Sequence, residues 1–381
     1  MNLVDVTLHD LTVDPHAALA AARATGPVAW LPAVDGWVVT GRDAAVEVMR
    51  DPHRFTVDDP RFTTGQILGP SMLSTDGSDH ARHRGPFTRW FSDRAELLRL
   101  GHWMTEYARR LVAGFQPDGR AELRSALAAP LAAGTVTHML RLESTGAAAL
   151  LRWYAEIVAG VHNLATGDAA GESATQAHRE LSAAITAVSR TEPPALLIDA
   201  MGVLSADEVV ANAAVILFGG IETAEGATAN AIWHLLTNPA ALDAVQADRS
   251  LVGTAVEESL RLEPAAASID RYATTDTELF GASIRAGDYV VVSLAGANRD
   301  PAVFANPDQF DLGRSNLRAH TTFALGPHAC LGIHLARSQA IAGVEALLDG
   351  LDSIRLGDDA NGPLGLVFRK PASLDATWVP R

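Results

Sequence analysis

The feature that most constrains this chain is a glycine-rich loop that carries its only cysteine. Cys330 lies in the segment 323–332, Phe-Ala-Leu-Gly-Pro-His-Ala-Cys-Leu-Gly, directly before a helical pattern over residues 333–340. Backbone N–H groups and the positive end of a helix dipole stabilise a thiolate there, and the thiolate is the form that binds metal. Gly326 and Gly332 lack a β-carbon, so the loop can approach a flat cofactor closely. An isolated cysteine would more often be a small buried hydrophobe, but this spacing favours a ligand loop.

Composition limits the class of protein. The 381 residues contain no Ser/Gly/Pro-rich linker, so we expect one domain over residues 1–381. Hydrophobic residues make up 48% and charged residues 20%, as in an ordinary globular protein. The net charge of −15 argues against nucleic acid or an anionic membrane as the main partner. The longest apolar run, 209–221, is too short for a membrane span, and no basic signal-peptide region begins the sequence, so we expect a cytoplasmic protein.

Periodicity predicts a mainly α protein with smaller β-sheet regions. Residues 26–41 read as a hairpin after an initial helix, and a capping box at 205–208 begins a long helix that reaches about residue 236. Apolar patterns predict helices near 93–115, 124–141, 146–160 and 174–190. β-Branched and aromatic residues predict strands near 268–274, 279–284 and 289–294.

The long helix contains an unusual turn. Residues 218–224, Phe-Gly-Gly-Ile-Glu-Thr-Ala, place two glycines inside a helix at a cost of about 1 kcal/mol each. One explanation is close packing of helices at the glycines, with a solvated Glu222. The other is a locally opened helix beside a bound ligand, where Glu222 and Thr223 relay protons.

Two clusters of charge allow either a structural or a solvated interpretation. Glu258 and Arg261 are three residues apart on one helix face, and Arg314 follows in the segment that leads to the cysteine loop. Such pairs usually lie in solvent and contribute little. In the basic cluster 80–84, His80 and Arg84 share a helix face and could bind a pair of carboxylates, although a solvated patch is the common outcome.

Together these segments resemble the cytochrome P-450 superfamily. The loop matches the pattern F-x-x-G-x-H/R-x-C-x-G at Phe323, Gly326, His328, Cys330 and Gly332. It departs from the commonest form at Ala324, where a glycine usually stands, and we expect this to alter loop packing. Residues 218–224 are similar to the family's A/G-G-x-D/E-T motif, and residues 76–91 to its D-x-x-x-H-x-x-x-R helix. The matched motifs run in order from residue 80 to residue 332.

The resemblance implies a cytochrome P-450 fold with a long central helix over the haem. It implies haem b as cofactor, with Cys330 as the axial ligand of the iron. Thr223 would hydrogen-bond the dioxygen bound there, and Glu222 would feed protons to it. Four residues would contact the haem propionates: His80, Arg84, Arg271 and His328. Three loop residues, Phe323, Gly326 and Gly332, would contact the cofactor. Glu258, Arg261 and Arg314 would form a structural ion network behind the loop.

By the same resemblance the chain is a haem-thiolate monooxygenase that uses O2 to oxidise a small, largely hydrophobic organic substrate in secondary metabolism, by hydroxylation, epoxidation or oxidative coupling. The substrate pocket would be lined by Leu68, Val215, Phe218, Gly219, Ala266, Ala267, Ile269, Ser373 and Leu374. Electrons would come from a ferredoxin or flavodoxin with its reductase, and the protein would be a monomer. A haem sensor without turnover and a peroxide-driven oxidase remain alternatives; the acid and alcohol at 222 and 223 argue against both.

Overall fold

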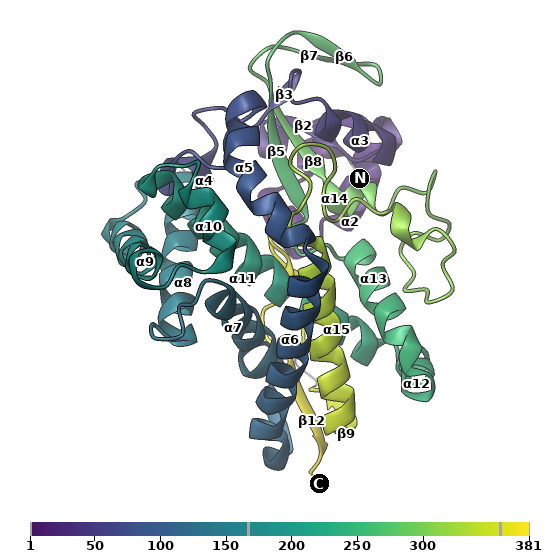
Figure 1. The fold of residues 1–381 in the computed structure, drawn as a ribbon. Coiled ribbons are helices and arrows are strands. Elements are labelled where there is room, and N and C mark those ends of the chain that lie inside the picture. The colour runs from purple at the N-terminus through teal and green to yellow at the C-terminus, as the bar shows by residue number, and fades with distance from the viewer. Residues whose placement is uncertain (1, 166–167, 358–359, 381) are drawn as a thin grey trace. The chain divides into compact units, whose positions relative to one another are not determined.

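The computed structural model describes residues 2–165, 168–357 and 360–380 and is mainly helical (Figure 1). It divides into two compact units, each described here by itself. The first unit contains residues 1–56, 101–131 and 222–381, and the second contains 57–100 and 132–221. Three helices contribute residues to both: α6 (Arg94–Phe115), α7 (Ala129–Met139) and α11 (Ala206–Thr237). The expectation of a single domain stays a prediction.

The first unit holds all the strands that the structure describes. Its helices are α1 (Leu8–Val13), α2 (His16–Thr25), α3 (Arg42–Arg50), α12 (Pro239–Ala247), α13 (Val252–Leu262), α14 (Leu294–Ala297) and α15 (Ile333–Gly350). Its strands are β1 (Val28–Leu31), β2 (Gly36–Val39), β3 (Phe55–Thr56), β4 (Arg120–Glu122), β5 (Ser268–Ala273), β6 (Thr277–Leu279), β7 (Ala282–Ile284), β8 (Tyr289–Ser293), β9 (Asp352–Leu356), β10 (Pro363–Leu364), β11 (Lys370–Pro371) and β12 (Asp375–Val379).

The largest sheet joins the N-terminal hairpin to strands more than 200 residues later in the chain. Its order is β1-β2-β8-β5-β3, with β2 parallel to β8 and the other pairs antiparallel. Apolar residues of β2, β5 and β8 pack with α3 in one core, which includes Val39, Val48, Phe55 and Val290. Figure 1 shows α3 beside this sheet. Ala324 and Leu325 of the cysteine loop pack against the same core, so the sheet supports the loop directly.

The described residues of the second unit form helices and loops, with no strand among them. It contains α4 (Thr63–Leu68), α5 (Gly77–Ser92), α8 (Ala147–Ala165), α9 (Glu172–Thr191) and α10 (Ala195–Met201). The predicted capping box at the start of α11 is confirmed: the Ser205 backbone N–H donates to the Glu208 carboxylate at 2.9 Å, and the Glu208 N–H donates to the Ser205 hydroxyl at 3.3 Å. Arg82 of α5 also binds this carboxylate, at 2.6 Å. Hydrogen bonds from Arg82 and from Ser205 lower the pKa of Glu208 to about 2.

Most of the elements expected from the sequence are confirmed, including the hairpin at 26–41, the helices and the long α11. The strand expected over 279–284 is confirmed only in part. Leu279 ends β6 and residues 282–284 form β7, but Phe280 and Gly281 take positive φ values of 49° and 85° and reverse the chain between the two strands. The three-stranded sheet β4-β12-β9 was not foreseen. Its strands are short and lie far apart in sequence, so no local pattern marks their pairing.

Helix α11 is the one candidate for a membrane span among the described residues. It is longer than the 13-residue apolar run within it, and by length and composition it could cross a bilayer. The protein itself buries 67% of its most apolar window, as happens in the core helix of a soluble protein.

Candidate active site

The cysteine loop is a series of tight turns closed by backbone hydrogen bonds. The N–H of Ala324 donates to the carbonyl of Thr321 at 2.8 Å, and the N–H of Ala329 donates to Gly326 at 3.1 Å. The N–H of Cys330 donates to the carbonyl of Phe323 at 2.8 Å. Cys330 is exposed and stands three residues before α15, whose N-terminal end favours a thiolate electrostatically. The loop therefore presents its sulfur from a fixed backbone.

Two loop residues adopt left-handed backbone conformations. Gly326 has φ of 75°, and a β-carbon there would lie 2.3 Å from the carbonyl oxygen of Met49, so only glycine fits. Ala324 has φ of 53° in spite of its β-carbon. This is the position where the family pattern usually has glycine, and the backbone explains the preference. Alanine is tolerated because it packs against the core of the main sheet.

We expect Ala324→Gly to raise the free energy of unfolding by up to about 1 kcal/mol, because it removes a strained β-carbon at positive φ. Gly326→Ala is the matched opposite change and should lower haem content and thermal stability sharply. Denaturant unfolding and haem absorbance of both variants test this. A destabilised Ala324→Gly protein would show that the packing of the methyl group outweighs the backbone strain.

An aromatic and ionic cluster fixes the start of the loop. The Arg337 guanidinium of α15 lies 4.9 Å from the centroid of the Phe323 ring. Arg337 Nε also donates to Glu257 of α13 at 2.7 Å, and His320 Nε2 lies 3.1 Å from the same carboxylate. Burial alone would raise the pKa of Glu257, but the hydrogen bonds from His320 and Arg337 hold it at about 2. No sequence pattern marks this cluster, because Glu257 lies 63 residues before His320 and 80 residues before Arg337.

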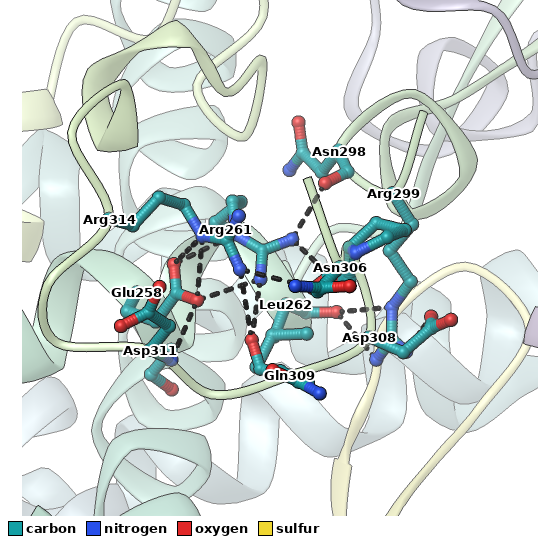
Figure 2. A network of polar contacts seen from close by, with 12 residues as sticks. Glu258, Arg261, Leu262, Asn298, Arg299, Asn306, Asp308, Gln309, Asp311 and Arg314 are labelled. Atoms are coloured by element: carbon teal, nitrogen blue, oxygen red, sulfur yellow. Dashed lines mark hydrogen bonds and ion pairs between the residues drawn. The ribbon is translucent and has the colours of Figure 1, made fainter. Parts of the chain in front are cut away.

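Glu258 lies at the centre of a buried ion network behind the loop (Figure 2). Both of its carboxylate oxygens accept hydrogen bonds from Arg261 at 2.8 Å, and Arg314 Nε donates to them at 3.0 and 3.2 Å. The side chains of Glu258 and Arg261 are 0% exposed and that of Arg314 is 4% exposed. This is a buried network and not a surface ion pair.

The remaining donors of the two arginines bind backbone carbonyls. Arg261 donates to Asn298, Pro307 and Gln309 at 2.9, 2.7 and 3.1 Å. Arg314 donates to Ala305 at 2.7 Å and also to Asn306 and Gln309. The irregular segment 298–314 is therefore wrapped around the two cations, as Figure 2 shows.

Asn298 connects this network to the cysteine loop. Its carbonyl accepts from Arg261, and its side-chain oxygen accepts the Thr321 backbone N–H at 2.6 Å. Its side-chain nitrogen donates to the Thr322 hydroxyl at 2.9 Å, and that hydroxyl donates to the Leu260 carbonyl at 2.7 Å. Sequence reasoning missed Asn298, because one asparagine outside any motif gives no signal.

Glu258→Ala should leave two buried guanidinium groups without their carboxylate, at a cost of about 3–5 kcal/mol. We expect little soluble haem-loaded protein, measured by yield, haem absorbance and melting temperature. Glu106→Ala is the matched control, since Glu106 pairs with Arg109 at the same i,i+3 spacing but lies 65% exposed. Equal behaviour of the two variants would contradict a supporting role for Glu258.

The basic cluster of α5 is largely engaged and is not a solvated patch. His80 is 6% and His83 1% exposed. His83 Nδ1 lies 2.7 Å from Asn212 Nδ2, and the Asn212 side-chain oxygen accepts the N–H of Met72 at 2.9 Å. Burial, followed by the charge of Arg82, lowers the pKa of His83. Asn212 thus ties the loop that follows Leu68, one of the predicted pocket residues, to α11.

The four residues predicted to contact the haem propionates lie in two places. His80 and Arg84 share a face of α5 in the second unit. Arg271 and His328 lie in the first unit, on β5 and in the cysteine loop. Arg271 is buried and donates to the Asp270 carbonyl at 2.7 Å. Each pair offers cationic or donor groups suited to carboxylates.

Helix α11 is continuous through its glycines, so the locally opened helix is not found. A β-carbon on Gly220 would lie 2.7 Å from Val136, which supports close helix packing at that glycine. Gly219, in contrast, faces open space and is exposed, and Val215 and Thr223 are half-buried. These three residues are four apart, so they form one uncovered stripe along an otherwise buried helix.

Glu222 does not lie in solvent. Its carboxylate accepts a hydrogen bond from Lys370 Nζ at 2.8 Å, and Glu225, three residues later, accepts from the same nitrogen at 2.9 Å. Lys370 is the only lysine of the chain, and no sequence pattern marked its contact with Glu222.

The remaining predicted pocket residues differ in exposure. Ala266, Ile269 and Ser373 are half-buried, whereas Phe218, Ala267 and Leu374 are buried. Nearby, Leu366 and Val367 are 40% and 38% exposed. Within the first unit, the exposed thiol, the half-buried Thr223, the partly exposed Leu366 and Val367 and the donor groups of Arg271 and His328 fit a flat apolar macrocycle that carries carboxylates.

The chain belongs to the cytochrome P450 family. The family description "Cytochrome P450" matches residues 174–350. The chain is 33% identical over 368 residues to cytochrome P450 monooxygenase PikC of Streptomyces venezuelae, which covers 91% of this chain and 86% of that protein. It is 31% identical to vitamin D(3) 25-hydroxylase of Pseudonocardia autotrophica, with 94% and 90% covered. The structure of CYP109Q5 from Chondromyces apiculatus matches all of both chains with a TM-score of 0.88 and 27% identity.

The protein is accordingly a cytochrome P450 monooxygenase, an oxidoreductase whose family implies a haem-thiolate cofactor, O2 and a redox partner. The mainly α fold with small sheets is confirmed.

Proposed function

We propose that Cys330 binds the iron of haem b as a thiolate and that this chain oxidises a neutral, largely hydrophobic organic compound. The observation that carries the proposal is the exposed Cys330 thiol on a loop whose backbone is fixed by its own turns and by Asn298. When bound, the haem supplies the redox centre at which O2 is activated and one oxygen atom passes to the substrate.

The residues of the chain bind, orient and supply protons. His80 and Arg84 on α5, with Arg271 and His328 in the first unit, would bind the two propionates. Phe323 with Arg337 packed on it would limit access of water to the sulfur. Thr223 on the uncovered stripe of α11 would hydrogen-bond oxygen, and Glu222 would deliver protons.

The substrate class follows from the residues proposed to line the pocket. Leu68, Val215, Phe218 and Ile269 are apolar, and none of the proposed lining residues is charged, so a charged reacting group would lose its hydration without compensation. Relatives with names such as vitamin D(3) 25-hydroxylase and nocardicin C N-oxygenase support an organic metabolite as substrate. A screen of candidate compounds for a low-to-high-spin shift of the haem tests this class.

We further propose that a ferredoxin or flavodoxin with its reductase supplies electrons, and that the protein acts as a monomer in the cytoplasm. Among the residues near the loop, Arg318 is exposed beside a cavity of about 640 Å³ and offers positive charge to an acidic donor. The relatives named as monooxygenases and hydroxylases give no support to a sensor without turnover.

The reduced protein under carbon monoxide should show the red-shifted Soret band of thiolate ligation. Cys330→His should abolish that band, and Cys330→Ser, which keeps the size of the side chain, should abolish it as well. Absorbance spectra of the three proteins test the assignment. A wild-type spectrum typical of histidine-ligated haem would overturn it.

Thr223→Ala should keep haem and substrate binding while product formed per NAD(P)H consumed falls and peroxide rises, because only proton placement is disturbed. A reconstituted assay gives both quantities. Thr228→Ala is the control: it lies in the same helix, buried, with its hydroxyl donated to the Ala224 carbonyl at 2.9 Å. Unchanged coupling in Thr223→Ala would remove Thr223 from the mechanism.

A further inference from the structure

A compact charge cluster joins α11 to β11 within the first unit. Lys370 Nζ donates to Glu222 Oε2 at 2.8 Å and to Glu225 Oε2 at 2.9 Å. The two glutamates are three residues apart on α11 and therefore share a face. Arg124 Nε lies 2.9 Å from the second oxygen of Glu225. One ammonium group is thus shared almost equally between two carboxylates.

The acids of the cluster are more buried than its cations. The side chains of Glu225 and Glu222 are 5% and 10% exposed, against 17% for Lys370 and 33% for Arg124. Burial raises the pKa of Glu225, and the charges of Lys370 and Arg124 oppose that rise. Without a cation, two buried carboxylates this close would bind a proton readily.

The cluster is held in place from the backbone. Arg124 Nη1 donates to the carbonyls of Pro371 and Ala372 at 3.1 and 2.5 Å, directly after Lys370. Lys370 itself pairs with Leu364 across β10 and β11. The Lys370 side chain therefore starts from a fixed strand and is not a mobile surface lysine.

One further carboxylate lies beside the cluster. Glu122 accepts the backbone N–H groups of Arg124, Ser125 and Leu374 at 2.8–2.9 Å. Burial would raise the pKa of Glu122, but these hydrogen bonds and that of the Ser125 hydroxyl lower it overall. Glu122 therefore stays ionised and adds negative charge beside the cluster, whereas Lys370 is the cation that contacts Glu222.

We propose that Lys370 is a positioning residue for the acid at position 222: its ammonium group keeps the Glu222–Glu225 pair ionised and holds Glu222 in place for proton delivery. The consequence for turnover rests on the proposed role of Glu222 in supplying protons. The consequence for ionisation does not, because it follows from the geometry of the cluster alone.

Infrared titration of the resting, haem-loaded protein tests the ionisation. The bands of the two protonated carboxyl groups are assigned by the loss of one in Glu222→Gln and of the other in Glu225→Gln. Lys370→Met should move the pH midpoint of these bands upward by about 1 to 3 pH units, because a neighbouring positive charge is removed. Glu225→Gln should move the remaining band downward, because one negative neighbour is removed. Loss of folding alone would not move the pH midpoint upward in Lys370→Met and downward in Glu225→Gln.

Two variants provide the controls. Lys370→Arg keeps the positive charge and should return the midpoint close to that of the wild type. Arg109→Met removes one positive charge at a surface pair with Glu106 and should leave the midpoint unchanged. An unchanged midpoint in Lys370→Met, or movement in the same direction for Lys370→Met and Glu225→Gln, would overturn the proposal. If Lys370→Met does not fold, Lys370→Gln removes the same charge while keeping a polar side chain, and an unchanged midpoint in that variant would overturn the proposal equally.

The pH profile of coupling separates this proposal from the proposed function. Product formed per NAD(P)H should follow the shifted midpoint in Lys370→Met and recover in Lys370→Arg. If Glu222→Gln leaves coupling unchanged but the infrared band still moves in Lys370→Met, the role of Glu222 in proton supply fails. The assignment of Lys370 as a positioning residue then stands. If Glu222→Gln uncouples the enzyme and the band of Lys370→Met does not move, Lys370 has no such role.

Discussion

The cysteine loop depends on one buried carboxylate. Glu258 binds Arg261 and Arg314, and their remaining donors bind the carbonyls of an irregular segment that has no regular structure of its own. Buried charges are stable only when paired and fully hydrogen-bonded, so the network fixes that segment in one conformation. Through Asn298 the same network reaches Thr321 and Thr322 at the start of the loop. The loop that carries Cys330 is therefore held in place by ion pairs of Glu258, a residue distant from the cysteine in the sequence.

A second set of ion pairs, centred on Glu257, joins the cysteine loop to α15. Glu257, next to Glu258 in the chain, binds His320 and Arg337, and Arg337 covers the Phe323 ring. The adjacent acids of α13 thus face two different partners: one organises the segment before the loop, and the other joins the loop to α15. Glu257 and Glu258 both lie on α13. Displacement of this helix would therefore disturb both networks and, through them, the loop that carries the thiol.

Helix α11 combines two functions along its length. Its stripe of Val215, Gly219 and Thr223 stays uncovered, whereas Glu222 and Glu225 point to Lys370. The helix needs no local opening to present Thr223, since residues four apart share a face. The proposed proton donor accepts a hydrogen bond from a cation that lies almost 150 positions later in the sequence.

Local patterns and fixed spacings were enough to predict the family, the mainly α fold, the long helix with its capping box and the cysteine loop. The sequence also marked Glu258, Arg261 and Arg314, but only the tertiary structure showed that their side chains are buried together. Asn298, the Glu257 cluster and the β4-β12-β9 sheet join residues distant in the chain and leave no local signal. The contact of Lys370 with Glu222 also leaves no local signal. Which charges pair across the fold depends on which side chains burial brings together, and the spacing of residues in the sequence does not show this.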